Sequence, residues 1–135
     1  MMTELTQDVV PGSGFRHKIW YFGLFGPEMC RAVRPYTNLP IDVHLMVEYP
    51  SEWIIPFKNA GADIITFHVE SCEHHLHSVL QQIHSSGIKG GVVLCPATPI
   101  ESCVNILNDC DLVLLMSVSN SSVEKKDSAS DGLVR

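Results

Sequence analysis

The chain has 135 residues, a length that suits one domain with its own core, and its net charge is −6 with histidine counted as neutral. This acidic balance argues against nucleic acid or an anionic membrane surface as the partner. The composition, 45% hydrophobic and 18% charged, is typical of a globular protein. No apolar run approaches the ~20 residues of a membrane span, and the N-terminus lacks the pattern of a signal peptide, so we expect a cytosolic protein.

Strand-like and helix-like segments alternate along the middle of the chain. The expected strands are 41–47, 63–70, 91–95 and 111–118. The expected helices are 27–34, 51–60 and 73–85, with Pro56 predicting a kink or a later start in the second of them. A fourth helix is expected after Thr98, which would be its N-cap, with an apolar stripe of Ile100, Cys103, Val104 and Leu107.

This alternation indicates βαβ units and a parallel sheet covered by helices. Two architectures remain open, a doubly wound open sheet and part of a (β/α)8 barrel. Neither G-x-G-x-x-G nor G-x-x-x-x-G-K follows any strand, so nothing supports the nucleotide-binding version of the open sheet. A whole barrel needs about 250 residues, and four strands are half of one.

The two ends of the chain differ from this middle part. Residues 1–21 show no clear pattern, and the serine-rich residues 119–135 are predicted to be a disordered tail. The five cysteines contain no C-x-x-C pair and lie mostly in apolar segments. We therefore expect buried free thiols rather than disulfides or a zinc site.

The segment Ile41–Val47 is the most informative of the expected strands. Asp42, His44 and Met46 lie on one face of it, and the other face is apolar. From the residues alone, His44 is either a metal ligand or a buried histidine bonded to a neighbour. Asp42 either supports such a site or makes a structural ion pair or hydrogen bond.

Two further groups of polar residues stand out. Thr66, His68 and Glu70 share one face of the second strand and are interpreted as facing the barrel interior, more as buried polar structure than as catalysts. The histidines of the third helix are interpreted as a solvated face rather than a metal cluster, because apolar residues define the opposite, buried side. They are His74, His75, His77 and His84.

Four blocks of the sequence resemble the ribulose-phosphate 3-epimerase family. They are P-I-D-V-H-L-M-V (40–47), A-G-A-D-I-I-T-F-H-V-E (60–70), P-A-T-P (96–99) and D-L-V-L-L-M-S-V (111–118). The blocks occur in the family's order and spacing, from about residue 22 to residue 118. The resemblance implies a partial (β/α)8 TIM barrel of the ribulose-phosphate-binding type, in which these strands are the third to sixth of eight.

The resemblance also implies a reaction. The family interconverts ribulose 5-phosphate and xylulose 5-phosphate by moving a proton beside a ketone, with a divalent metal of the Zn, Fe, Mn or Co class stabilising the enediolate. His44 matches a metal-binding and substrate-contacting histidine. Met46 and Met116 match methionines that line the substrate pocket, although without the resemblance they could equally be core residues.

Parts of the family's pattern do not occur in this sequence. The second-strand motif H-x-D-x-M-D-G should precede Phe22, and the glycine-rich phosphate loop should follow Val118, where the sequence reads S-N-S-S. No catalytic aspartate is retained in a matching motif. We therefore predict that the chain alone is inactive.

Two alternatives remain beside the interpretation as an epimerase. The chain could be a non-catalytic pseudoenzyme or splice form that associates with itself or with full-length epimerase, because a half barrel leaves open edges at strands 41–47 and 111–118. It could also be another phosphate-binding barrel enzyme such as a hexulose-phosphate synthase. Those enzymes place a lysine two residues after the strand aspartate, where this chain has His44 after Asp42.

Overall fold

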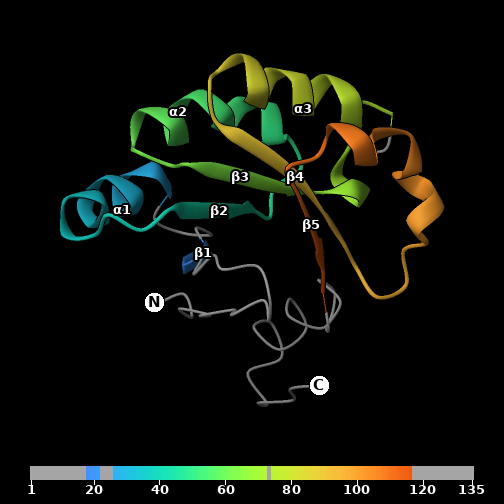
Figure 1. The fold of residues 1–135 in the computed structure, drawn as a ribbon, viewed down its shortest axis with the longest axis horizontal. Helices are drawn as coiled ribbons and strands as arrows, with labels where there is room; N and C mark the ends of the chain where they lie inside the picture. Colours follow the sequence, from blue (N-terminus) through green and yellow to red (C-terminus); the bar gives the residue numbers. More distant parts are fainter. Residues whose placement is uncertain (1–17, 22–25, 73, 117–135) are drawn as a thin grey trace.

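Five parallel strands form a single sheet in the computed structural model (Figure 1), which describes residues 18–21, 26–72 and 74–116, the first of these ranges by its backbone only. The strands are β1 (Lys18–Tyr21), β2 (Ile41–Leu45), β3 (Ile64–His68), β4 (Lys89–Leu94) and β5 (Leu112–Leu115). The last four are the strands expected from the sequence; β2, β3 and β5 are shorter than expected, and β4 begins two residues earlier and ends one residue earlier. β1 was not expected and lies in the segment 1–21.

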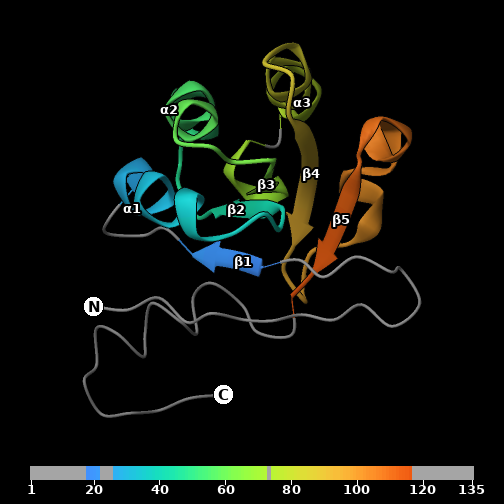
Figure 2. The same ribbon diagram turned by 60° about the vertical axis from the view of Figure 1, so that its left-hand side comes forward.

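The order of the strands decides between the two architectures. Each strand pairs in parallel with the next one along the chain, so the order in the sheet is β1-β2-β3-β4-β5. A doubly wound sheet reverses its order at a switch point and has helices on both faces. Here the order of the described strands does not reverse, and the helices lie in an arc on one side of the sheet (Figure 2). The partial barrel is confirmed.

The three α-helices follow the prediction with small shifts. They are α1 (Gly26–Val33), α2 (Ile54–Asn59) and α3 (Leu76–Ser85). A 3-10 helix at Pro50–Trp53 precedes α2, so the later start that Pro56 predicted is confirmed. Pro56 lies in the first turn, where its missing N–H costs no hydrogen bond. Gly87 ends α3 with a left-handed φ of 87° and donates its N–H to the carbonyl of His84 at 2.9 Å.

The expectation of an α-helix after Thr98 is wrong. The structure has two 3-10 helices there, η4 (Ile100–Ser102) and η5 (Val104–Asp109). Thr98 does not cap them, because its hydroxyl donates to the carboxylate of Glu70 instead. The expected stripe also changes. Ile100 and Val104 are about half exposed, while Cys103 and Ile106 are buried at the three-residue spacing of a 3-10 helix.

The core lies between the sheet and the helices. Along β2 and β3 the apolar side chains that alternate with polar ones are buried, among them Val43, Ile65 and Phe67. They belong to the same buried cluster as Phe57 of α2 and Leu80 of α3. Burying a side chain of this kind contributes roughly 1.5–3 kcal/mol. The apolar face therefore holds the helices in place and leaves the polar face of these strands turned away from them.

Two aspartates connect neighbouring strands at the amino-terminal end of the sheet, each by accepting a backbone N–H of the preceding strand. Asp63 precedes β3, and its Oδ2 accepts the N–H of Ile41, the first residue of β2, at 2.8 Å. Asp111 precedes β5, and its Oδ2 accepts the N–H of Gly90 in β4 at 2.9 Å. Each carboxylate thus ties the start of one strand to the start of the strand before it, which sets the register.

The edges of the sheet differ from the expectation. β2 is not an edge, because β1 pairs with it from Lys18↔Ile41 to Tyr21↔His44. The outer strands among those described are β1 and β5. The tail predicted at 119–135 lies outside the described residues, as do the last residues of strand 111–118. Within the described part of the chain, no helix is long and apolar enough to cross a membrane.

Candidate functional site

Four polar side chains are buried on the inner face of β2 and β3. They are Asp42, His44, Thr66 and His68, each at most 2% exposed. The register pairs His44 with Thr66, so the two histidines come from neighbouring strands near their carboxyl ends. Active sites of (β/α)8 barrels lie at this end of the strands. The expectation that Thr66 and His68 face the barrel interior agrees with this placement, whereas Glu70 follows β3 in a 3-10 turn, Val69–Ser71.

The two histidines contact each other directly. Their Nε2 atoms are 2.7 Å apart, and the rings stack with centroids 4.7 Å apart. Burial lowers the pKa of His44 to about 3, and the neighbouring His68 adds to this effect. Burial also lowers the pKa of His68, although the charge of Glu70 and its hydrogen bond act in the opposite direction. Both rings are therefore neutral at pH 7, and one Nε2 donates to the other.

Asp42 is fully buried beside this pair. Its Oδ1 accepts a long hydrogen bond of 3.4 Å from the Thr66 hydroxyl. Its Oδ2 has no hydrogen-bond partner among the described residues. Burial raises the pKa of Asp42 to about 7, against the smaller effect of Thr66. Of the alternatives for Asp42, the structure shows the structural hydrogen bond.

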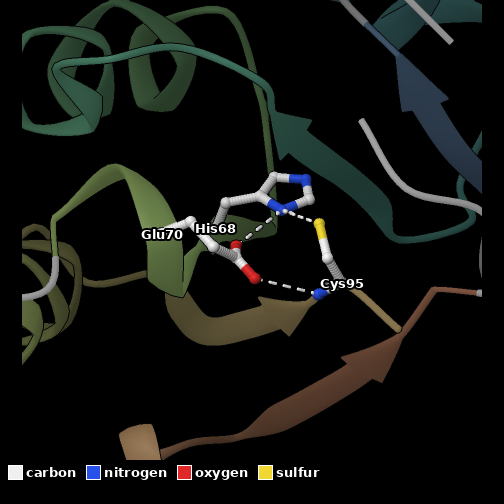
Figure 3. Close-up of side chains that lie close together, drawn as sticks. All are labelled: His68, Glu70 and Cys95. Carbon is white, nitrogen blue, oxygen red and sulfur yellow. Dashed lines mark hydrogen bonds and ion pairs between the residues drawn. The ribbon is translucent and has the colours of Figure 1, made fainter. Parts of the chain in front are cut away.

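A second group of polar atoms surrounds the other nitrogen of His68 (Figure 3). Glu70 Oε2 lies 3.3 Å from His68 Nδ1, and Cys95 Sγ lies 3.8 Å from the same nitrogen. Glu70 Oε1 accepts the backbone N–H of Cys95 at 3.0 Å and the Thr98 hydroxyl. His68, Glu70 and Cys95 together are a group of side chains that could hold a metal ion.

The carboxylate of Glu70 is the charged member of this group. Burial acts to raise its pKa, but the hydrogen bonds from Thr98 and Cys95 and the nearby His68 outweigh burial and hold the pKa below its ordinary value. Sequence reasoning singled out His68 and Glu70 but missed Cys95. Strand alternation places Cys95 on the same face as Gly91 and Val93 of β4, and this was the signal that could have found its inward position. Its place next to His68 depends on the register of β3 and β4.

The remaining candidates are placed less centrally. Met46 directly follows β2 and is 36% exposed, and Met116 follows β5 and is half-buried. Both stand at carboxyl ends of strands.

The interpretation of His74, His75, His77 and His84 as a solvated face is confirmed, because all four are exposed. The cysteines are free thiols as expected, with Cys30 and Cys103 buried and Cys72, Cys95 and Cys110 partly so.

A sequential parallel sheet with helices on one side and polar side chains at its carboxyl ends defines a segment of a (β/α)8 barrel. The model of the ribulose-phosphate 3 epimerase family matches residues 23–123. The chain therefore belongs to the ribulose-phosphate 3-epimerase family.

Curated relatives agree with the family match over most of the chain. Over 94 residues the chain is 51% identical to the ribulose-phosphate 3-epimerases of Bacillus subtilis and of Rhodospirillum rubrum. Over 95 residues it is 47% identical to the chloroplastic ribulose-5-phosphate-3-epimerase of Arabidopsis thaliana. Each match covers 70% of this chain but only 43%, 41% and 34% of these three relatives. The chain thus spans less than half the length of the relatives it matches.

Proposed function

We propose that this chain forms one wall of a ribulose-phosphate 3-epimerase active site, built from the third to sixth barrel strands. The reaction is the interconversion of D-ribulose 5-phosphate and D-xylulose 5-phosphate by proton transfer beside the ketone. The observation that carries the proposal is the position of His44, buried at the carboxyl end of β2 with its ring held by His68. The family match supports it.

His44 is the residue that would hold the divalent metal. It fits this role because a metal ligand must be a neutral imidazole, and burial keeps its pKa at about 3. His68 engages Nε2, so we assign the ligand atom as Nδ1. The metal, of the Zn, Fe, Mn or Co class, would supply Lewis-acid stabilisation of the enediolate oxygens.

His68 and Glu70 position His44 in this arrangement. With its Nδ1 as the ligand atom, His44 carries its proton on Nε2 and donates it to His68 Nε2, 2.7 Å away. His68 then carries its own proton on Nδ1, which faces the Glu70 carboxylate at 3.3 Å. Partners of this kind fix the orientation and tautomer of a ligand histidine. Met46 and Met116 would line the pocket beside the substrate.

A chimera tests the proposal. Residues 23–118 replace the matching segment of the Bacillus subtilis relative, which supplies the other strands. We expect the chimera to convert ribulose 5-phosphate, and His44→Ala to lower kcat/KM by about 100-fold or more because a metal ligand is lost. The exposed His77→Ala serves as the matched control and should retain activity. A folded chimera without activity contradicts the proposal.

The purified 135-residue chain is expected to be inactive by itself. The family's acid/base aspartates have no counterpart in a matching motif of this sequence, and proton transfer on both faces of the substrate needs two such groups. The assay uses the chain loaded in turn with Zn²⁺, Mn²⁺ and Co²⁺. Conversion that disappears in His44→Ala would overturn this expectation.

A second candidate function is association with full-length epimerase subunits or with another copy of the chain. It is favoured by β5, an outer strand of the described sheet whose Val113 and Leu115 are 36% and 70% exposed. An exposed apolar strand at a sheet edge pairs readily with another chain. We expect co-purification with an intact epimerase, lost in Leu115→Lys and kept in Ile55→Lys, which changes an exposed residue of α2. A stable monomer at all concentrations contradicts it.

A further inference from the structure

We propose that His68, Glu70 and Cys95 form a binding site for a thiophilic divalent cation such as Zn²⁺, as an alternative to the metal position assigned to His44 and not occupied together with it. The three side chains come from neighbouring points at the carboxyl ends of β3 and β4. His68 is the last residue of β3, Glu70 lies in the turn after it, and Cys95 directly follows β4 (Figure 3). Their ligand atoms all lie within 4.8 Å of one another.

The two separations from His68 Nδ1 are close to those of ligands around one tetrahedral ion. With metal–ligand bonds of about 2.0–2.3 Å, nitrogen and oxygen ligands lie about 3.3 Å apart, and nitrogen and sulfur ligands about 3.6 Å apart. The structure places His68 Nδ1 3.3 Å from Glu70 Oε2 and 3.8 Å from Cys95 Sγ. The nitrogen–sulfur separation is thus about 0.2 Å longer than the ideal one.

The same distances argue against a nucleophilic cysteine. In a Cys–His–carboxylate relay, the thiol and the carboxylate contact opposite nitrogens of the histidine, so that the carboxylate orients the base. Here both groups converge on Nδ1, and Nε2 faces His44 instead. A cation bound to His68 Nδ1 would therefore have the carboxylate and the thiol beside it as further ligands.

The surroundings hold the ligands in place. Glu70 Oε1 is fixed by the N–H of Cys95 at 3.0 Å and by the Thr98 hydroxyl, which leaves Oε2 directed at His68. Its carboxylate is ionised at neutral pH, since its pKa lies below the ordinary value. His68 is 2% exposed, and Nε2 makes the outer contact to His44 that ligand histidines commonly have.

The donor set selects the ion. One thiolate, one imidazole and one carboxylate suit Zn²⁺ or Co²⁺, whereas Mg²⁺ and Ca²⁺ prefer oxygen ligands alone. Three protein ligands leave the fourth tetrahedral position for water or for an oxygen of a small molecule. This position lies at the end of the strands where the pocket of the proposed epimerase would be.

Cobalt absorption tests the site in the full 135-residue chain. The reduced chain is titrated with Co²⁺ without oxygen, and thiolate-to-cobalt charge transfer is followed in the near ultraviolet. We expect one equivalent to give the band and Zn²⁺ to remove it. Cys95→Ser should abolish the band, and Glu70→Gln should weaken Co²⁺ binding about tenfold or more.

Cys110→Ser is the matched control, because Cys110 is also partly buried but its thiol faces the carbonyl of Ile106. It should retain the band, and circular dichroism should show that all variants fold without metal. A wild-type chain without the band at millimolar Co²⁺, or a band that survives in Cys95→Ser, overturns the proposal. The band reports on Cys95 and the chimera's activity on His44, so failure of this site is distinguishable from failure of the epimerase proposal.

Discussion

His44 and His68 share a single proton. Their Nε2 atoms are 2.7 Å apart and both rings are buried, so one nitrogen donates and the other accepts. Which one donates depends on the far side of His68. With Glu70 as the neighbour of Nδ1, the proton of His68 belongs on Nδ1, and His44 is the donor. With a metal on Nδ1, the proton must move to Nε2, and His44 becomes the acceptor.

The first prediction is that Zn²⁺ reverses the tautomers of both histidines. In the metal-free chain, ring nitrogen NMR should show protons on His68 Nδ1 and His44 Nε2. Stoichiometric Zn²⁺ should move them to His68 Nε2 and His44 Nδ1, because the metal at Nδ1 of His68 excludes the proton there. Cys95→Ser should prevent the change, whereas Cys110→Ser should not. Unaltered His44 signals after zinc has bound would falsify the coupling.

The second prediction concerns the charge of His44 in the metal-free chain. Burial lowers the pKa of its ring to about 3, so it should stay neutral from pH 8 to about pH 4. The unfolded chain binds this proton near pH 6.5. The stability linked to His44 is therefore complete above pH 6.5 and declines as the pH falls from there toward 3. An NMR titration checks this, with the same chain in urea as reference. A folded-state ring that ionises near pH 6.5 contradicts it.

The third prediction compares the contributions of Arg34 and Arg31 to the free energy of unfolding. Arg34 donates to the carbonyls of Gly61, Thr37 and Leu39 and to Asp63 at 2.6–3.1 Å. Its stem lies so close to Gly61, whose φ is 99°, that no Cβ fits there. Arg34→Met should lower the free energy of unfolding by about 2–3 kcal/mol because several acceptors lose their donor.

Arg31 is the control for this variant. It makes an exposed ion pair with Glu28 one helical turn away, and the two side chains are 52% and 80% exposed. Pairs of this kind contribute little, so Arg31→Met should change stability by about 0.5 kcal/mol or less. Urea unfolding followed by circular dichroism measures both. Equal effects of the two variants would show that the Arg34 contacts do not hold η1 (Arg34–Tyr36) to the start of β3.

The fourth prediction uses the carboxylate that ties β5 to β4. Burial acts to raise the pKa of Asp111, but hydrogen bonds from the Gly90 N–H and from His84 at 2.9 Å outweigh it and hold the pKa below 3.8. The folded pKa is depressed, so the stabilisation is present above the unfolded pKa and is lost as the pH falls through the folded one. Asp111→Asn should cost about 0.5–1 kcal/mol at pH 7, a value reduced for the partial exposure of the group.

That cost should shrink as the pH falls from 3.8 through the lower folded pKa, because the wild-type carboxylate then becomes neutral as well. Asp109→Asn is the comparison, since Asp109 is exposed and only approaches His77 at 3.9 Å. It should leave stability unchanged within about 0.5 kcal/mol at both pH values. Thermal unfolding at pH 7 and pH 3 measures the two differences. A cost for Asp111→Asn that grows on acidification would reverse the sign and exclude this role.

The residues show which parts of this fold a sequence can predict. β2, β3 and the inward position of His44 followed from alternation, because strand residues point alternately to the two faces, whereas β4 and β5 followed from continuous apolar runs. The 3-10 helices after Pro99 did not follow, since the Thr98 hydroxyl is taken by Glu70, 28 residues earlier in the chain. The contact between His44 and His68 depends on the register of β2 and β3, and the place of Cys95 depends on that of β3 and β4. No local pattern contains either register.

The last prediction tests the register of β4 and β5 directly. Gly91 pairs with Leu112, and a Cβ at Gly91 would lie 2.3 Å from the carbonyl oxygen of Leu112. The strands must separate to admit it, so Gly91→Ala should lower the free energy of unfolding by about 2–3 kcal/mol. Gly90 is the matched control one residue away. Its Cβ would meet the end of the Leu80 side chain at 2.7 Å, which can rotate, so Gly90→Ala should cost about 1 kcal/mol. Urea unfolding of the two variants decides, and a larger loss for Gly90→Ala would contradict the pairing of Gly91 with Leu112.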